Sequence, residues 1–149
     1  MFQNVILGLL VMVGCLFVQA LLVTAAMRTY ARHSAAVERG SFGSTMLVIC
    51  GVMIVLVVGN FLQVCIWGAL FIQLGEFEDF QVAVYHSAVN FATLGYGDIV
   101  MSARHRILGP MQSLNGILMM GVSTAVVMSA LQDALQRMRS ARLDNGNTD

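Results

Sequence analysis

The charged residues of this chain fall into a few short clusters, and long uncharged stretches separate them. The uncharged stretches cover residues 1–27, 40–75, 80–97 and 107–132. A helix needs roughly 20 predominantly apolar residues to cross about 30 Å of hydrocarbon. Three of the four stretches meet that requirement. We therefore predict three transmembrane helices, near residues 4–27, 46–74 and 107–135.

The amino-acid composition agrees with a membrane protein and excludes several other classes. Hydrophobic residues make up 58% of the chain and charged residues only 11%, whereas soluble domains carry about a quarter charged residues. So much apolar surface excludes intrinsic disorder. A net charge of zero supplies no basic surface for nucleic acid. The expected fold class is an all-α membrane protein with lipid around it.

The sequence contains no arrangement of side chains that would support catalysis. It has no nucleophile beside a base, no paired intramembrane carboxylates and no cluster of metal ligands. Cys15, Cys50 and Cys65 lie inside predicted spans at no metal-ligand spacing, where a thiol behaves as a small hydrophobe. We therefore expect no enzyme activity, no cofactor and no small-molecule substrate.

The fourth uncharged stretch, residues 80–97, is too short and too polar to cross a membrane. Its first part, FQVAVYHSAVNFA, predicts a helix of about three turns, and its second part is rich in glycine. Non-helical backbone is tolerated at membrane depth only where protein or a water-filled cavity surrounds it. We therefore predict a re-entrant segment between the second and third spans, beside an aqueous space.

Residues 93–98 read TLGYGD, and this pattern predicts a cation filter. Backbone carbonyls can replace the water around an ion only if successive residues turn them the same way. Such a backbone needs dihedral angles that L-residues avoid and glycine adopts at little steric cost. Gly95 and Gly97 supply glycine at alternate positions. Thr93 adds a hydroxyl at the inner end, and Tyr96 can point its ring outward as a brace.

The TLGYGD segment resembles the selectivity filter of tetrameric potassium channels, and the order of outer helix, pore helix, filter and inner helix matches over residues 46–135. The likeness is closest to small bacterial channels with a two-transmembrane pore, to which this chain adds an N-terminal span. The resemblance implies a homotetramer in a bacterial inner membrane. It also implies that potassium, the one expected metal, binds at backbone carbonyls of Thr93, Leu94, Gly95, Tyr96 and Gly97.

The resemblance also implies a supporting shell around this filter, with several departures. Asp98 matches the acid that holds the outer end of the filter. Tyr85 and His86 stand where the best-known bacterial channels have paired tryptophans, and Val89 stands where they have a buried glutamate. Tyr85 or His86 is expected to hold Asp98 instead. His86 has two interpretations, a packed residue of the pore helix or a proton sensor.

The last span carries two glycines and a row of residues that could line a cavity. Gly116 and Gly121 interrupt an apolar run, and similar channels bend at a glycine in this helix. Close packing against the pore helix explains either glycine equally well. With a hinge at Gly116, Met120, Thr124 and Met128 would face the cavity, where an apolar lining can gate by dewetting.

The arginines set the expected orientation. Cytoplasmic segments carry the excess of arginine, and six of the eight arginines follow the first or third span. These six are Arg28, Arg32, Arg39, Arg137, Arg139 and Arg142. The N-terminus is then external and the C-terminus cytoplasmic.

The remaining charges should lie at the external mouth. Glu76, Glu78 and Asp79 precede the pore helix, where negative charge suits the positive end of the helix dipole and would attract cations to an outer vestibule. The expected domain organisation is an N-terminal helix and basic loop (1–45), a pore domain (46–138) and a short cytoplasmic tail (139–149).

The function expected from these observations is passive conduction selective for potassium. Two alternatives stay open: a non-selective cation channel, and a non-conducting membrane scaffold or regulatory subunit with the same fold. Reversal potentials in mixed potassium and sodium separate the first alternative, and flux from the purified protein separates the second.

Overall fold

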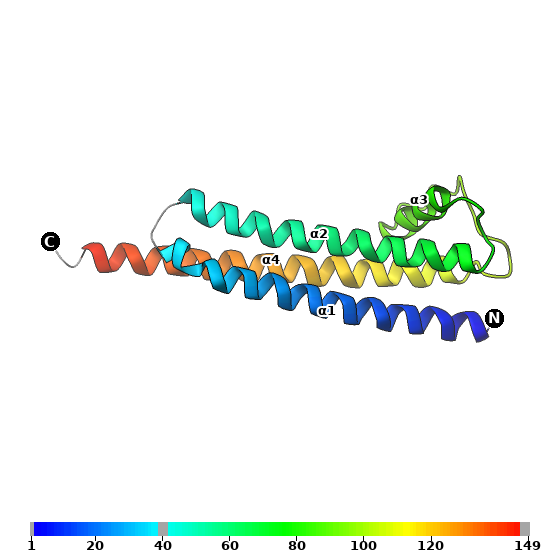
Figure 1. The fold of residues 1–149 in the computed structure, drawn as a ribbon, viewed down its shortest axis with the longest axis horizontal. Coiled ribbons are helices and arrows are strands. Elements are labelled where there is room, and N and C mark those ends of the chain that lie inside the picture. The colour runs from blue at the N-terminus through cyan, green and yellow to red at the C-terminus, as the bar shows by residue number, and fades with distance from the viewer. Residues whose placement is uncertain (1, 39–41, 147–149) are drawn as a thin grey trace. The chain divides into compact units, whose positions relative to one another are not determined.

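The computed structural model describes residues 2–38 and 42–146, and this part of the chain forms four helices and no strand (Figure 1). The helices are α1 (Phe2–Glu38), α2 (Phe42–Gln73), α3 (Phe80–Phe91) and α4 (Leu108–Gly146). The all-α fold class is confirmed. Arg39, assigned above to the cytoplasmic side, lies outside the described residues.

Three of the helices are long and apolar enough to cross a membrane. The spans are Phe2–Arg32, Thr45–Gln73 and Leu108–Ser140, of 31, 29 and 33 residues. They confirm the three predicted transmembrane helices, and the first and third run further than predicted. Helical hydrogen bonding does not stop where the hydrocarbon ends, and the arginines, alanines and leucines beyond it are good helix formers. For the same reason α4 continues to Gly146, into the segment predicted as a tail.

The described residues divide into two compact units, each with its own apolar core. One unit combines the chain up to Ala20 with Val58–Gly121, and the other combines Leu21–Val57 with the chain from Val122 onward. The first core is built by Cys15, Trp67, Leu70, Phe71, Ala83 and Leu108. The second is built by Ala26, Tyr30, Val52, Leu56 and Ala130. The first unit contains α3 and the TLGYGD segment.

Helix α3 begins and ends on identifiable local signals. Asp79 is its N-cap, with extended backbone, and its Oδ1 accepts a hydrogen bond from the Gln81 amide at 2.7 Å. At the other end, the Thr93 amide donates to the Asn90 carbonyl and the Leu94 amide donates to the Val89 carbonyl, both at 2.9 Å. These two bonds form a Schellman motif. The TLGYGD segment therefore begins within the motif that ends α3.

Close backbone contacts hold α3 against α2 and α4. A Cβ added at Gly68 of α2 would lie 3.3 Å from the backbone of Val84 on α3, and one added at Gly116 of α4 would fall on the Phe91 carbonyl group. Hydrogen bonds supplement this packing. The Ser87 hydroxyl donates to the Val64 carbonyl at 2.6 Å and accepts from Gln112 Nε2 at 2.5 Å. The position of the TLGYGD segment is therefore fixed from both neighbouring helices.

Candidate functional site

The TLGYGD segment has a backbone with alternating handedness. Thr93, Gly95 and Gly97 have φ values of 57°, 62° and 71°, while Leu94 and Tyr96 between them do not have positive φ. In an ordinary strand the side chains of successive residues, and likewise their carbonyl groups, point in opposite directions. Reversing the handedness at every second residue brings successive carbonyls toward one side, which is the requirement for a column of oxygen ligands.

Thr93 is the residue of this backbone that sequence reasoning did not mark as left-handed. A β-branched residue with positive φ is an outlier, and such strain costs about 1–3 kcal/mol. The structure gives the reason, because Thr93 occupies the position of the Schellman motif that glycine usually fills. The same conformation both ends α3 and starts the alternating backbone.

The side chains of this segment are uncovered in the single chain. All residues from Ala92 to Asp98 are exposed, including Leu94 at 53% and Tyr96 at 64%. At Gly95 and Gly97 an added Cβ would meet nothing within 4 Å. The glycines are therefore required here by dihedral angle rather than by crowding.

Asp98 is bound by Tyr85, one of the two residues that the sequence offered as its partner. The Tyr85 hydroxyl on α3 donates to Asp98 Oδ2 at 2.6 Å. This hydrogen bond lowers the pKa of the Asp98 carboxyl and raises the pKa of the Tyr85 phenol. The C-terminal end of the TLGYGD segment is therefore tied to α3.

His86 has a hydrogen-bond partner at each of its two ring nitrogens. Nδ1 lies 2.9 Å from the Ile99 carbonyl and Nε2 lies 2.9 Å from Asn90 Nδ2. A carbonyl can only accept, so Nδ1 carries the proton and Nε2 accepts from the amide. Burial lowers the pKa of His86, with a partial offset from Ile99 and nearby carboxylates. These observations favour the packed residue over the proton sensor.

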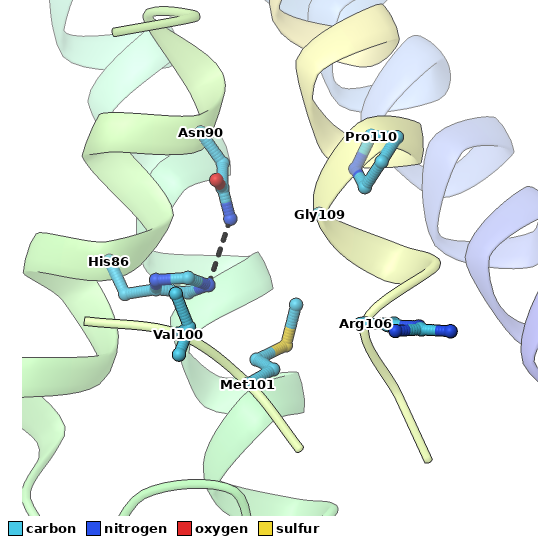
Figure 2. A pocket seen from close by; sticks show the side chains of 7 residues that line it. All are labelled: His86, Asn90, Val100, Met101, Arg106, Gly109 and Pro110. Atoms are coloured by element: carbon cyan, nitrogen blue, oxygen red, sulfur yellow. Dashed lines mark hydrogen bonds between the residues drawn. The ribbon is translucent and has the colours of Figure 1, made fainter. Parts of the chain in front are cut away.

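His86 also forms one wall of a pocket of about 380 Å³ beside the segment that follows TLGYGD (Figure 2). The pocket is lined by His86, Asn90, Val100, Met101, Arg106, Gly109 and Pro110. Val89, the other supporting residue suggested by the resemblance, is buried on α3 and contributes its carbonyl to the Schellman motif.

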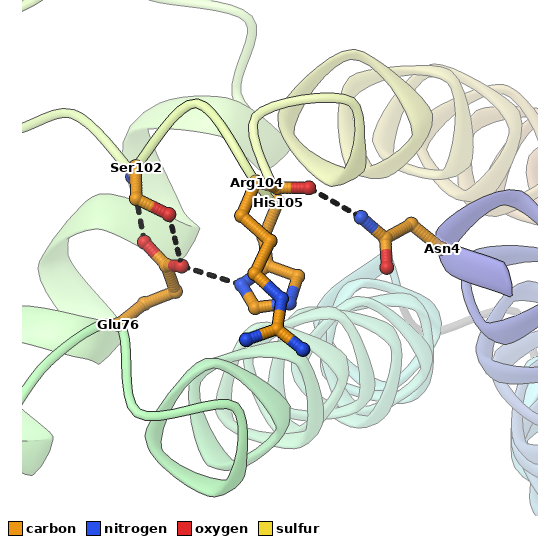
Figure 3. Close-up of polar contacts among 5 residues, drawn as sticks. All are labelled: Asn4, Glu76, Ser102, Arg104 and His105. Atoms are coloured by element: carbon orange, nitrogen blue, oxygen red, sulfur yellow. Dashed lines mark hydrogen bonds and ion pairs between the residues drawn. The ribbon is translucent and has the colours of Figure 1, made fainter. Parts of the chain in front are cut away.

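Glu76 ties the loop before α4 to the end of α2. Its Oε2 accepts from the Ser102 amide at 2.6 Å, and its Oε1 accepts from the Ser102 hydroxyl at 2.6 Å and from His105 Nδ1 at 2.5 Å (Figure 3). Burial raises the pKa of Glu76, but the hydrogen bonds from Ser102 and His105 outweigh it and the pKa is lowered. From α1, Asn4 Nδ2 donates to the Arg104 carbonyl at 2.5 Å.

This network changes the assignment of the three acids before α3. The Glu76 side chain is only 6% exposed, so its carboxylate holds the loop and does not face solvent. Glu78 and Asp79 are exposed. Sequence reasoning missed Ser102 and His105 as partners of Glu76. No signal in the sequence connects positions 26 and 29 residues apart along the chain.

The two glycines of α4 differ in their surroundings. Gly116 is buried and lies against the Phe91 carbonyl, whereas Gly121 is exposed and has space for a Cβ. The helix is continuous through both. For Gly116 this favours packing over a hinge. Met120, Thr124 and Met128 recur every four residues on α4 and are exposed in the single chain.

Comparison with known proteins assigns the family. The sequence profile of a family described as "Ion channel" matches residues 48–133, which is 86 of the 149 residues. The chain belongs to the ion channel family. The match begins in α2 and ends in α4, so α1 lies outside it. No curated protein matches the chain, and no solved structure matches it.

Family membership and the three apolar helices identify the chain as an integral membrane protein whose function is passive ion conduction. Within the described part of the chain, no group of three or more His, Cys, Asp or Glu side chains could hold a metal ion.

Proposed function

We propose that the channel is a homotetramer selective for potassium, with carbonyls of Thr93, Leu94, Gly95, Tyr96 and Gly97 as its filter. The observation that carries this proposal is the positive φ at positions 93, 95 and 97, directly after a short helix. An ion in a filter needs oxygens in place of its hydration shell, and a backbone of alternating handedness would offer one column of them.

One chain can supply only one side of such a filter. Most homo-oligomers have closed rotational symmetry, and four copies around a shared axis would complete the filter. Leu94, Tyr96 and Val100 are exposed in the single chain, and neighbouring copies around the axis would cover them. Met120, Thr124 and Met128 would then line a central cavity, and Gly121 would be the place where α4 can bend.

We assign the orientation from the arginines. Arg28 and Arg32 near the end of the first span, together with Arg137 and Arg139 near the end of the third, would be cytoplasmic. The N-terminus would be external, and α3 with the filter would form a re-entrant segment entering from that side. Exposed Glu78 and Asp79 would then raise the cation concentration at the mouth, and Tyr85 would brace the filter through Asp98.

The test is ion flux from purified protein in liposomes, measured first in potassium and then in sodium. Gly95→Ala should abolish potassium flux, because a Cβ in a left-handed conformation costs about 1–2 kcal/mol in each of four subunits. Gly14→Ala is the matched control, since Gly14 lies in α1 and an added Cβ meets nothing within 4 Å. Equal flux of both cations would indicate a non-selective channel, and no flux would indicate a scaffold or regulatory subunit.

A further inference from the structure

Helix α1 is the part of the chain that the ion channel family does not account for, since the family match begins at residue 48. The first half of α1 nevertheless belongs to the same compact unit as α3 and the TLGYGD segment. Two close contacts hold it there. Gln63 Nε2 on α2 donates to Gln19 Oε1 at 2.8 Å, and both side chains are buried. A Cβ added at Gly8 would lie 2.6 Å from the Met111 Cε on α4. The additional helix is therefore packed directly on this unit.

The start of α1 reaches the loop between the TLGYGD segment and α4, residues 99–107. Asn4 Nδ2 donates to the Arg104 carbonyl at 2.5 Å. Arg104 lies in a hydrogen-bonded turn, because the His105 amide donates to the Ser102 carbonyl at 3.2 Å. A turn closed by its own backbone hydrogen bond moves as one piece. The Asn4 side chain therefore holds this turn by a carbonyl within it.

Glu76 holds the same turn from the end of α2, through Ser102 and His105. In Figure 3 the loop residues lie between Glu76 on one side and Asn4 on the other. Anchors on two sides restrict a turn more than an anchor on one side, because the turn then has no single point about which to pivot. The contact from α1 thus adds a restraint that Glu76 alone does not supply.

The turn is only a few residues beyond the TLGYGD segment. The Ile99 carbonyl lies 2.9 Å from His86 Nδ1, and three residues separate Asp98 from Ser102. Each residue has only two soft backbone dihedral angles, so this short connection can absorb little displacement of the turn. The position of the turn therefore bears on the end of the TLGYGD segment.

We propose that Asn4 is a positioning residue of the filter. By holding the Arg104 carbonyl it fixes the turn that follows the TLGYGD segment, and with it the C-terminal end of the filter backbone. Helix α1 then contributes to ion selectivity although it lies outside the family match. This inference rests on the proposed function, because it takes residues 93–97 as the filter.

Asn4→Leu removes the donor and keeps a side chain of similar size. One polar contact between membrane helices shifts an equilibrium roughly threefold, so the turn should open about threefold more often in this variant. Amide hydrogen exchange of the purified protein in detergent, followed by mass spectrometry, should therefore be about threefold faster over residues 99–107. Peptides from α2 should exchange as in the wild type, which shows that the variant is folded. In liposomes the selectivity for potassium over sodium should fall several-fold.

Two further variants separate the hydrogen bond from a general effect on α1. Asn4→Gln keeps an amide donor, so its exchange and its selectivity should lie closer to the wild type than those of Asn4→Leu. Gln3→Leu is the matched control, because it places the same apolar side chain at the neighbouring exposed residue of α1. Its exchange and its selectivity should equal those of the wild type.

The two readouts distinguish a failure of this inference from a failure of the proposed function. If the wild type selects potassium, unchanged exchange in Asn4→Leu overturns the inference, and so does faster exchange with unchanged selectivity. An equal effect of Gln3→Leu also overturns it. If the wild type does not select potassium, the proposed function is wrong and the filter role of Asn4 is wrong with it. Faster exchange in Asn4→Leu alone would then show only that Asn4 holds the turn.

Discussion

Replacing Gly116 or Gly121 with alanine distinguishes packing from bending in α4. A Cβ at Gly116 falls on the Phe91 carbonyl group and lies 3.0 Å from the Phe91 Cα, so it meets backbone that cannot rotate away. Overpacking of this kind costs about 1–3 kcal/mol. Alanine stabilises a helix by about 1 kcal/mol relative to glycine, which offsets part of this cost. Gly116→Ala should therefore be up to about 2 kcal/mol less stable than the wild type.

Gly121→Ala raises the helix propensity of α4 without a steric clash, since nothing lies within 4 Å of a Cβ added there. It should be up to about 1 kcal/mol more stable than the wild type. Denaturant titration of the purified protein in detergent, followed by circular dichroism, measures both variants. The reasoning is refuted if Gly116→Ala is as stable as Gly121→Ala. Loss of flux in a stable Gly116→Ala protein would instead assign the hinge to Gly116.

Three further predictions follow from the hydrogen bonds. Tyr85→Phe removes the donor to Asp98, so potassium-over-sodium selectivity in liposomes should fall several-fold, and unchanged selectivity would show that Tyr85 is not the brace. Glu76 has a pKa lowered from 4.5, so its contribution to folding stability is present above pH 4.5 and is lost as the pH falls through the lowered pKa. Glu76→Gln should therefore remove the part of the fall in melting temperature at acid pH that is due to this group. The same dependence of melting temperature on pH in the wild type and the variant would exclude this contribution. Gln63 Nε2 donates to Gln19 Oε1 at 2.8 Å, so Gln19→Leu should lower the free energy of unfolding by about 0.6–1.7 kcal/mol. The double variant Gln19→Leu with Gln63→Leu should recover most of that free energy in the same denaturation assay.

Several features of this protein are decided by short-range properties of the sequence. Hydropathy and charge spacing define the three spans, because a span is recognised by its own length and composition. Asp79 before an amphipathic stretch starts α3, and Gly95 and Gly97 mark where left-handed backbone is needed. Each of these follows from residues within one or two turns of each other, so a sequence pattern suffices.

Other features depend on which helix faces meet, and only the tertiary structure decides them. Glu76 and His105 are 29 residues apart in the sequence, and Asn4 and Arg104 are 100 apart. The packing of Gly116 against Phe91 likewise joins α4 to the end of α3. No local pattern encodes these pairs, because the apolar surface of a membrane helix is similar all around and close contacts and buried polar groups select its partner. The sequence therefore marks where left-handed backbone is needed, and the folded chain determines which residues hold that backbone in place.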